Sequence, residues 1–392
     1  MWTSTGRFPH PQAKQQLLAL LYGQLAGAES LREIVHAFDS HAPRLYHLGA
    51  AKVTRSTLSD ANALRSLEVF AGLFAHLAAQ ALPGLRRTMR EAVHLIDATS
   101  LPLSSLSGDW AAFSTTACGA KLHVLYDPDA DCPLYAAVTP ANLNDITAAR
   151  DMPIDPMATY VFDLGYYDYA WWAKLDAAGC RIVTRLKSNT RLTILKENAV
   201  ADGGPVLSDR IGHLPQRLAA SRKNPFSDPV REICVRIQTG KILRILSNDL
   251  DAPAEEIAAL YKRRWRIELF FRWIKQTLKI RRFLGRSQNA VGIQIAVALI
   301  AFLILRLAQQ AQRAVQSPIA FARLVRANIM HRRPIDRLDQ PRPPPIYCLN
   351  QMTLEFPTML NRTAVNHARP STPLPVNPKC LSENMLNRLN GL

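Results

Sequence analysis

Hydrophobic residues follow a helical spacing in the first part of the chain. Between residues 13 and 82 apolar positions recur every three or four residues, and Ser30, with Glu33 three positions later, is typical of a capped helix start. This pattern predicts a small all-helical N-terminal domain of three or four helices over residues 1–85. Such a domain either binds DNA through a helix-turn-helix or simply covers the next domain, and the pattern fits both alternatives.

From residue 92 the pattern changes to short apolar segments separated by turns, which predicts β-strands. Five strands are expected, at 92–96, 121–126, 134–138, 160–162 and 181–184. Helical segments at 146–150 and 169–178 lie between the later strands. Three consecutive strands followed by alternating helices and strands predict a mixed α/β sheet.

Residues 190–250 have the composition of a β-rich insertion, with a hairpin expected from 233–238 and 242–246. Two long helices are predicted after it, at roughly 253–280 and 288–314. The second includes the longest uninterrupted apolar run of the chain. That run is far shorter than the ~20 residues that cross a bilayer, so it predicts a buried helix and no membrane partner.

A chain of 392 residues is long enough for two or three packed units. After the helical domain, residues 86–330 are expected to form one α/β domain that contains the insertion. The segment 331–392 is rich in proline and basic residues and predicts a poorly ordered tail.

Composition narrows the class of protein. Hydrophobic residues make up 48% of the chain, which excludes wholesale disorder. The 48 Lys and Arg against 31 Asp and Glu give a net charge of +17, which favours a polyanionic partner, nucleic acid before a membrane surface. The six cysteines have no zinc-site spacing and fit a reducing compartment, and the N-terminus lacks the pattern of a signal peptide. We therefore expect a cytoplasmic protein.

Two aspartates are placed where functional groups gather in α/β proteins. Asp97 and Asp163 each directly follow an apolar strand, and side chains just beyond the carboxyl ends of strands commonly form active sites. Either aspartate alone is more simply explained as a loop residue, because aspartate is common in turns.

A third carboxylate lies on an unusually basic helix. Residues 261–286 contain ten Lys and Arg but one acid, Glu268. At about 100° per residue, one exposed face is expected to carry Tyr261, Arg264, Glu268, Arg272, Lys275 and Lys279. The opposite, core-facing stripe is Ile267, Phe270, Phe271, Ile274 and Leu278. A lone carboxylate among cations suits a divalent metal ion held beside the phosphates of DNA.

Tyr261, Arg264, Glu268 and Lys275 have the spacing Y-x2-R-x3-E-x6-K. This pattern resembles the YREK signature of DDE transposases of the "IS four" insertion-sequence family. Other matching segments, over roughly residues 20–340, are Asp97-Ala98-Thr99, Asp163-Leu164-Gly165-Tyr166 and Ser247-Asn248-Asp249-Leu250. Motifs that occur in this order are far more specific than one short motif.

The resemblance implies an α/β fold with an RNase H-like core. Its mixed five-stranded sheet would have flanking helices, a β-rich insertion before the glutamate helix and a small all-helical N-terminal domain. Asp97, Asp163 and Glu268 would be the catalytic residues and would hold two Mg²⁺ ions, for which Mn²⁺ can substitute. The implied activity is cutting the ends of an insertion sequence and joining them to target DNA by two-metal phosphoryl transfer, through hairpinned ends.

The resemblance also implies the partners and the DNA-binding residues. Arg264 and Lys275 would contact phosphates near the cut and Tyr261 would position the strand, while Arg272 and Lys279 extend the same basic face. Trp265 either stacks on an unpaired base or belongs to the core. The partners would be double-stranded DNA at the terminal inverted repeats, target DNA, and a second copy of the chain in a synaptic homodimer.

Three other functions are compatible with parts of the sequence. An RNase H-like nuclease would cut without joining, although so many cations on one helix face argue against plain hydrolysis. A non-catalytic DNA-binding derivative of a transposase is disfavoured because all three carboxylates are present. A basic RNA-binding protein is disfavoured because the sequence lacks the aromatic or loop motifs of the common RNA-binding modules.

Overall fold

The computed structural model describes residues 11–85, 92–114, 117–201, 203–219, 222–280, 282–331 and 334–341. The described residues up to Gln340 belong to one compact unit. Most of the predicted tail lies outside the described residues.

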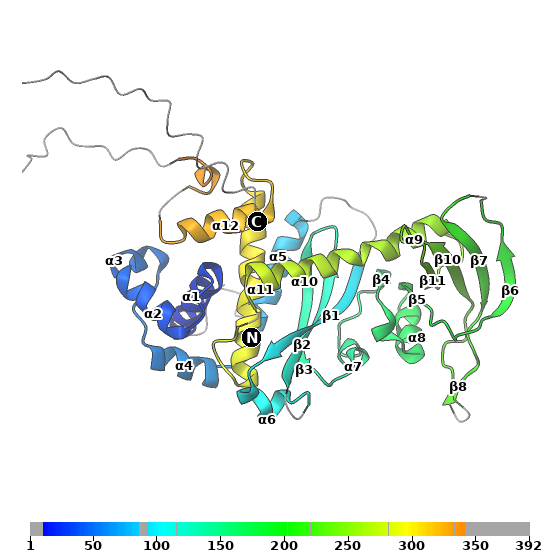
Figure 1. Cartoon of the computed structure of the whole chain (residues 1–392), viewed down its shortest axis with the longest axis horizontal. Helices are drawn as coiled ribbons and strands as arrows, with labels where there is room; N and C mark the ends of the chain where they lie inside the picture. Colours follow the sequence, from blue (N-terminus) through cyan, green and yellow to red (C-terminus); the bar gives the residue numbers. More distant parts are fainter. Residues whose placement is uncertain are drawn as a thin grey trace, which may run out of the picture. The chain divides into compact units, whose positions relative to one another are not determined.

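Helices account for almost all of the described N-terminal part (Figure 1). They are α1 (Pro11–Ala26), α2 (Leu31–Ser40), the short α3 (Ala42–Leu45), α4 (Arg55–Leu64) and α5 (Leu67–Leu85). The predicted start of α2 is confirmed, because the Glu33 N–H donates to the Ser30 hydroxyl while the Glu33 carboxylate accepts from the Ser30 hydroxyl and the Glu29 N–H.

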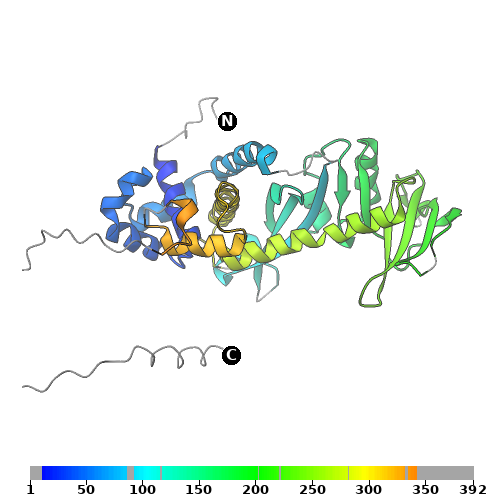
Figure 2. The ribbon, with the colours of Figure 1, turned by 90° about the horizontal axis from the view of Figure 1, so that it is seen from above.

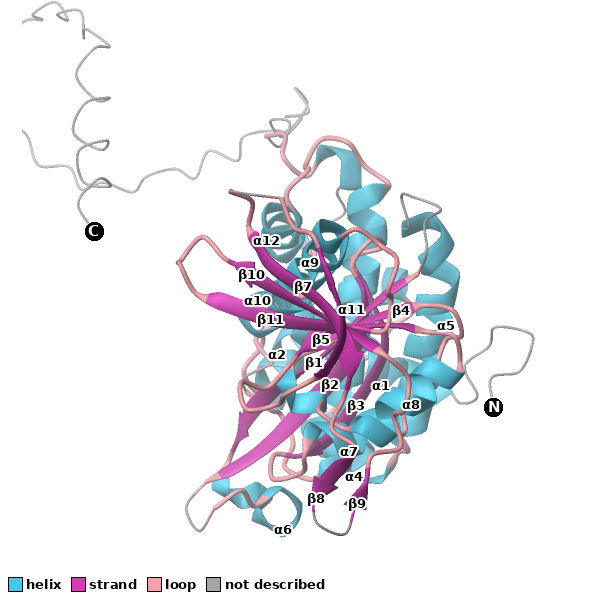
Figure 3. Cartoon of the chain, turned by 90° about the vertical axis from the view of Figure 1, so that its right-hand side faces the viewer, coloured by secondary structure: helices cyan, strands magenta, loops and turns pink. Residues whose placement is uncertain are grey.

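The central element is a mixed sheet whose strands run in the order β3-β2-β1-β4-β5-β11-β10-β7-β6 (Figure 3). The first five strands along the chain are β1 (Val93–Leu103), β2 (Cys118–Asp127), β3 (Cys132–Pro140), β4 (Thr159–Val161) and β5 (Arg181–Arg185). The later ones are β6 (Thr193–Asn198), β7 (Val206–His213), β10 (Val230–Arg236) and β11 (Ile242–Ser247), with β8 (Arg217–Ala219) and β9 (Arg222–Lys223) in a separate small sheet.

The predicted insertion is β-rich, and the structure shows where it goes. Its last strand, β11, pairs antiparallel with β5, so the insertion continues the five-stranded sheet instead of standing apart from it. Among the strands that the structure describes, β1, β4 and β5 are parallel to one another and the other pairs of the large sheet are antiparallel. The three parallel strands form the buried centre of the sheet, as parallel strands do.

Helices cover the sheet on two sides, and each side has its own core. The shorter helices are α6 (Gly108–Ala111), α7 (Asp145–Ala149) and α8 (Tyr169–Ala177). One core is aromatic and packs α8 onto the sheet through Phe162, Tyr166, Trp171 and Trp172. The other holds the long helices α9 (Ala254–Arg263), α10 (Trp265–Thr277) and α11 (Gln288–Gln310).

The helices α9 and α10 form an almost continuous rod that breaks only at Arg264 (Figures 1 and 2). The predicted apolar stripe of α10 is confirmed, because Ile267, Phe270, Phe271 and Ile274 are buried. Helix α12 (Pro318–Asn328) completes the described elements after α11.

Within the described residues α11 is the one helix long and apolar enough to cross a membrane, judged by length and composition. In the fold 89% of that apolar window is buried. Figure 2 shows α11 almost end-on, with α5 beside it, and the two helices pack along their lengths. The helix is therefore accounted for as the core of this protein, as the sequence predicts.

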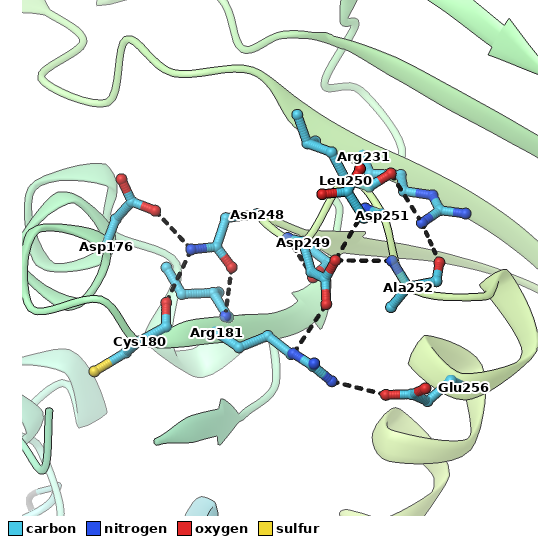
Figure 4. Close-up of polar contacts among 12 residues, drawn as sticks. Asp176, Cys180, Arg181, Arg231, Asn248, Asp249, Leu250, Asp251, Ala252 and Glu256 are labelled. Atoms are coloured by element: carbon cyan, nitrogen blue, oxygen red, sulfur yellow. Dashed lines mark hydrogen bonds and ion pairs between the residues drawn. The ribbon is translucent and has the colours of Figure 1, made fainter. Parts of the chain in front are cut away.

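The loop between β11 and α9 is held by a network of side-chain hydrogen bonds (Figure 4). Asn248 accepts from the Ile182 N–H at 2.7 Å and donates to Asp176 Oδ1 and the Cys180 carbonyl. Asp249 accepts from two backbone N–H groups of the loop and from Arg181 Nε at 3.0 Å. The network therefore joins β5, β11 and α8 at the point where the rod α9–α10 begins.

Buried Arg231 holds the same loop from the opposite side. Its guanidinium donates to both carboxylate oxygens of Asp209 and to the carbonyls of Leu250 and Ala252. Asp209 is also buried, so the pair is tied into the fold by hydrogen bonds to backbone as well as by charge. The start of the glutamate helix is thus fixed to the sheet ahead of the candidate site residues that the helix carries.

Replacing Asn248 by alanine is expected to lower the free energy of unfolding by about 2–3 kcal/mol, because it leaves the Ile182 N–H and the Cys180 carbonyl without their partner. Denaturant unfolding measures the loss. Asn189→Ala, at an exposed turn position, is the matched control and should change stability by less than about 0.5 kcal/mol. Equal effects of the two variants would contradict a structural role for Asn248.

Burial also gives the sheet a pH-dependent stability. His123, in β2, is fully buried, and desolvation lowers its pKa from 6.5 to about 4. The unfolded chain therefore takes up a proton at this residue near pH 6.5 while the folded chain does not. The stability that His123 contributes is complete above pH 6.5 and falls by about 3 kcal/mol toward pH 4. Comparing the pH profile of unfolding with that of His123→Gln isolates this contribution, and identical slopes would contradict it.

Candidate active site

Asp97 lies within β1 and not at its end. Strand β1 pairs in parallel with β4 over Val93–Leu95 and then continues to Leu103 against β2. The expectation that the strand stops at Asp97 is therefore wrong, because the antiparallel partner keeps the chain extended beyond it. Asp97 nevertheless follows the last parallel pair, so it lies at the carboxyl edge of the parallel strands.

Asp163 reaches the same edge from the neighbouring strand. It follows β4 and caps the short 3₁₀ helix Leu164–Tyr166, with its carboxylate accepting from the Gly165 N–H at 2.8 Å. A Cβ atom at Gly165 would lie 3.0 Å from Asp163 Oδ1 and 3.0 Å from Asp145 Oδ2. This close approach explains the glycine in the segment Asp163-Leu164-Gly165-Tyr166.

Glu268 arrives on α10 together with Arg264, the residue at the break of the rod. The Arg264 guanidinium donates through Nη1 to Asp97 Oδ2 at 3.1 Å and through Nη2 to Glu268 Oε1 at 2.5 Å. A single guanidinium thus spans two carboxylates that are 171 positions apart in the sequence (268 minus 97). All three side chains are largely shielded from solvent, with exposed fractions of 18%, 17% and 31% for Arg264, Asp97 and Glu268.

The other predicted residues of the helix face divide into two groups. Tyr261 is buried, so the expectation that it lies on an exposed face is wrong; the face turns toward the sheet there, and the Arg264 guanidinium lies 6.0 Å from the tyrosine ring. Trp265 is half exposed, with the Arg272 guanidinium 5.8 Å over its ring. Lys279 lies beyond the end of α10 and pairs with Glu29 at 3.6 Å.

An open pocket of about 390 Å³ lies beside the carboxylates. Its walls are Asp97, Ala98 and Thr99 of β1 and Glu268, Phe271, Arg272, Lys275 and Gln276 of α10. The structure therefore brings Asp97, Glu268, Arg272 and Lys275 to one hollow, which combines acidic oxygens with cations.

Asp97 is the most strongly perturbed carboxylate of this group. Burial raises its pKa to about 6, and the negative charges of Asp163 and Glu268 act in the same direction. The Ala98 N–H and the Arg264 charge oppose the increase. Asp97 is repelled by both other carboxylates and has lost much of its hydration. A neighbouring cation would therefore stabilise its charged form.

Sequence reasoning did not identify Asp145, which supplies a further acid at this edge. It is the first residue of α7, lies beside Gly165 and pairs with Lys121 at 2.9 Å. Burial raises the pKa of the nearby Tyr166 phenol, and the charges of Asp97, Asp145 and Asp163 add to the increase. An acid in the first turn of a helix is common, so the sequence contained no signal that separated Asp145 from a helix cap.

The donor set suits a hard divalent cation, because carboxylate oxygens are the ligands that such ions prefer. Asp97 and Glu268 already direct oxygens at one shared cationic group, the Arg264 guanidinium. Among the described residues no three acidic, His or Cys side chains are close enough together to hold a metal ion. The side chains are thus of the chemical type that binds a divalent metal ion. Their spacing in this structure is set by Arg264.

Carboxylates at the edge of a mixed sheet, faced by a basic helix, define a class of protein that acts on the phosphate groups of a polyanion. Comparison with known proteins makes this specific. A family model described as "Transposase DDE domain" matches residues 89–304. A second model, a "Domain of unknown function" (DUF4372), matches residues 10–51.

Curated relatives agree with the first match. A putative transposase, y4zB, of Sinorhizobium fredii is 42% identical over 293 residues, which cover 74% of this chain and 80% of the relative. A probable transposase for the insertion sequence element IS5377 of Geobacillus stearothermophilus is 25% identical over 323 residues, which cover 78% of this chain and 84% of the relative.

A solved structure of a piggyBac transposase synaptic complex with hairpin DNA aligns with a TM-score of 0.43 and 11% identity, covering 84% of this chain and 73% of that one. The family match and the first relative decide the assignment. The chain belongs to the DDE transposases and is an enzyme that acts on DNA. Its mixed α/β core is accordingly the RNase H-like fold of that family.

Arg264→Leu is expected to lower the free energy of unfolding by about 2 kcal/mol, because it leaves two shielded carboxylates facing each other without a cation. The same substitution in a Glu268→Gln background should lower the free energy of unfolding clearly less, since the repulsion between the Asp97 and Glu268 carboxylates has been removed. Denaturant unfolding of the four proteins gives the coupling. Lys262→Leu, an exposed position of the same rod, is the control. Additive effects of Arg264 and Glu268 would contradict the bridge.

Proposed function

We propose that this DDE transposase cuts DNA at the ends of an insertion sequence and joins them to target DNA, with Asp97, Asp163 and Glu268 as its catalytic carboxylates. The observation that carries the proposal is the Arg264 guanidinium held between Asp97 and Glu268. This contact supports a site in which carboxylates from β1 and α10, which are far apart in the sequence, bind a cation together. The effect of Asp163 on the pKa of Asp97 extends this argument to the third acid.

DDE transposase domains generally use divalent metal ions. We propose two Mg²⁺ ions held by Asp97, Asp163 and Glu268, with Mn²⁺ able to substitute. Bound there, the metal would activate the attacking hydroxyl and stabilise the leaving oxygen of the phosphodiester. The proposal requires Arg264 to release the carboxylates, which leaves its guanidinium free to contact a phosphate instead.

The surrounding cations suit the DNA strand that enters the pocket. Lys275 and Arg272 line the same hollow as Asp97 and Glu268, so they lie where phosphates beside the cut would run. Burial raises the pKa of the Tyr261 phenol, which therefore remains a hydrogen-bond donor near Arg264. Trp265, half exposed under Arg272, has a ring face suited to stacking on an unpaired base.

The membership of the "IS four" family, hairpinned ends, a synaptic homodimer and a cytoplasmic location belong to the same proposal. The first three rest on the YREK-like spacing of Tyr261, Arg264, Glu268 and Lys275, and the cytoplasmic location rests on the scattered cysteines. Lys279, which lies beyond the end of α10 and pairs with Glu29 in this structure, is included in the proposal as a DNA contact. A nuclease that cuts without joining is the alternative, and an assay for strand transfer separates the two, because only a transposase gives joined products.

Asp97→Asn is expected to reduce cleavage of DNA that carries the element's ends by more than about 100-fold, since a lost metal ligand should cost more than a lost outer-shell partner. Binding of the same DNA should remain, because phosphate contacts come from the cations. Gel assays of cleavage and binding in Mg²⁺ and in Mn²⁺ measure both effects. Asp228→Asn, an exposed carboxylate in the insertion, is the control. Normal cleavage by the Asp97 variant would reject the assignment.

A further inference from the structure

Arg264 lies between two of the proposed metal ligands, and among the described residues it pairs with no other acid. Its Nη1 and Nη2 atoms donate to Asp97 and Glu268, while its Nε atom is buried and has no hydrogen-bond partner. The Tyr261 ring, 6.0 Å from the guanidinium, is its aromatic neighbour. Charge-assisted hydrogen bonds are the strong ones, so the two carboxylates are the main contacts that keep the guanidinium in this position.

The contacts of Asp97 show which neighbour a metal ion has to replace. One carboxylate oxygen, Oδ1, accepts from the Ala98 N–H at 2.8 Å, and the other, Oδ2, accepts from Arg264. The Ala98 N–H belongs to the backbone of β1 and stays in place, whereas the guanidinium belongs to a side chain that can change rotamer. A divalent ion and the guanidinium are both cations and use the same oxygens. Binding of one therefore disfavours binding of the other.

The acids at this edge need a counter-charge. The charges of Asp163 and Glu268 both repel that of Asp97, and the Arg264 charge opposes their effect. If the guanidinium leaves, Asp97 and Glu268 face each other without compensation. Their affinity for a hard divalent cation then rises, because carboxylate oxygens are the ligands that such ions prefer.

The pocket beside the carboxylates is where the guanidinium can find another partner. Arg272 and Lys275 line this pocket together with Asp97 and Glu268. A DNA phosphate attracted by these two cations lies next to the carboxylates that Arg264 contacts. A guanidinium binds a phosphate through two parallel hydrogen bonds, so a bound phosphate is a strong competitor for it.

We propose that Arg264 takes the place of the metal in the free protein and thereby couples metal binding to DNA binding. Without DNA the guanidinium neutralises Asp97 and Glu268 and keeps their affinity for a divalent ion low. A phosphate of bound DNA takes over the guanidinium, and the two carboxylates become free for the ion. The inference rests on the proposed function and adds its regulation, because the free protein holds little of the metal that cleavage requires.

Thermodynamic linkage makes the effect reciprocal. If bound DNA tightens metal binding, bound metal must tighten DNA binding by the same factor. Coupling between two sites of one protein is commonly about 5-fold to 150-fold. Because one guanidinium serves two carboxylates here, we expect a factor of at least about tenfold.

A purely structural role for Arg264 makes a different prediction. If the guanidinium only held α10 against β1 while the metal used other atoms, its loss would leave the metal affinity unchanged. Loss of alignment of the carboxylates would even lower that affinity. The metal affinity of the DNA-free protein therefore separates the two roles without any measurement of cleavage.

The first test titrates Mn²⁺ into the DNA-free full chain and follows the bound ion by electron paramagnetic resonance. The relevant site is the one that Asp97→Asn removes. Arg264→Gln should tighten Mn²⁺ binding there by at least about tenfold relative to the wild type. Arg272→Gln is the matched control, because it removes the same charge from the same pocket, where the Arg272 guanidinium lies over Trp265. It should tighten binding by less than about threefold, since an exposed charge is screened by solvent and salt.

The second test measures the coupling to DNA. The probe is a duplex that carries the already cut end of the element and lacks the terminal 3′-hydroxyl group, so it binds but has no attacking group. At constant ionic strength Mn²⁺ should tighten its binding to the wild type by at least about tenfold and to Arg264→Gln by less than about threefold. Comparing each protein with and without Mn²⁺ cancels the phosphate contact that the variant has lost.

Three results would overturn the inference. They are equal Mn²⁺ affinity of the wild type and Arg264→Gln, equal gains from Arg264→Gln and Arg272→Gln, and an equal effect of Mn²⁺ on DNA binding by the wild type and Arg264→Gln. If Arg264→Gln does not fold, as judged by circular dichroism, Arg264→Lys replaces it, because an ammonium lacks the planar fork that holds both carboxylates. Arg264→Lys should bind Mn²⁺ at least about threefold more tightly than the wild type, and unchanged affinity would again overturn the inference.

Failure of the inference and failure of the proposed function give different results. If the wild type cuts the element's ends while Mn²⁺ affinity does not respond to Arg264, the inference fails and the proposed function stands. If the wild type binds the ends without cutting them in Mg²⁺ or Mn²⁺, the proposed function fails. Tighter Mn²⁺ binding by Arg264→Gln would in that case still identify Arg264 as the competitor of the metal.

Discussion

The contact on which the rest of the site depends is the pair of hydrogen-bonded ion pairs from Arg264 to Asp97 and Glu268. These contacts form only if α10 has one particular position along the sheet and one particular rotation about its own axis. Asn248, Asp249 and Arg231 fix the start of α9 at the edge of the sheet, and the buried stripe of α10 fixes its rotation. The polar network and the apolar stripe thus together determine the position of Glu268 relative to Asp97. An arginine suits this place better than a lysine, because its planar fork can serve two carboxylates at once.

The sequence predicted those parts that depend on local patterns. Strand and helix periodicity located the parallel strands, the hairpin from β10 to β11 and the rod α9–α10, because each is specified by nearby residues. It could not locate the end of β1, since the length of that strand depends on pairing with β2, which is a non-local partner. Helical arithmetic placed Tyr261 on the same face as Glu268 but could not show that this face turns toward the sheet near Arg264. Asp145 escaped notice for the same reason, because only the folded chain brings it beside Gly165.

The net charge of +17 is distributed unevenly between structure and surface. Arg231 is buried and paired with buried Asp209, so its charge serves the fold. Arg272 and Lys275 instead line the pocket beside Asp97. Composition alone therefore indicates that a polyanion is bound, while the position of the cations that line the pocket indicates where.

The insertion affects the site through the sheet. Because β11 pairs with β5, the four antiparallel strands that follow the parallel centre extend one continuous hydrogen-bonded layer. The rod α9–α10 starts directly after β11, the insertion strand that pairs with β5, and it carries Glu268, so one element joins the insertion to the carboxylates. Any movement that releases Arg264 from Asp97 must therefore either be confined to side chains or displace a helix that is fixed to the fold at both ends. The Arg264 backbone keeps right-handed helical dihedral angles (φ −52°, ψ −30°), so turning its side chain leaves the rod intact, which favours the first.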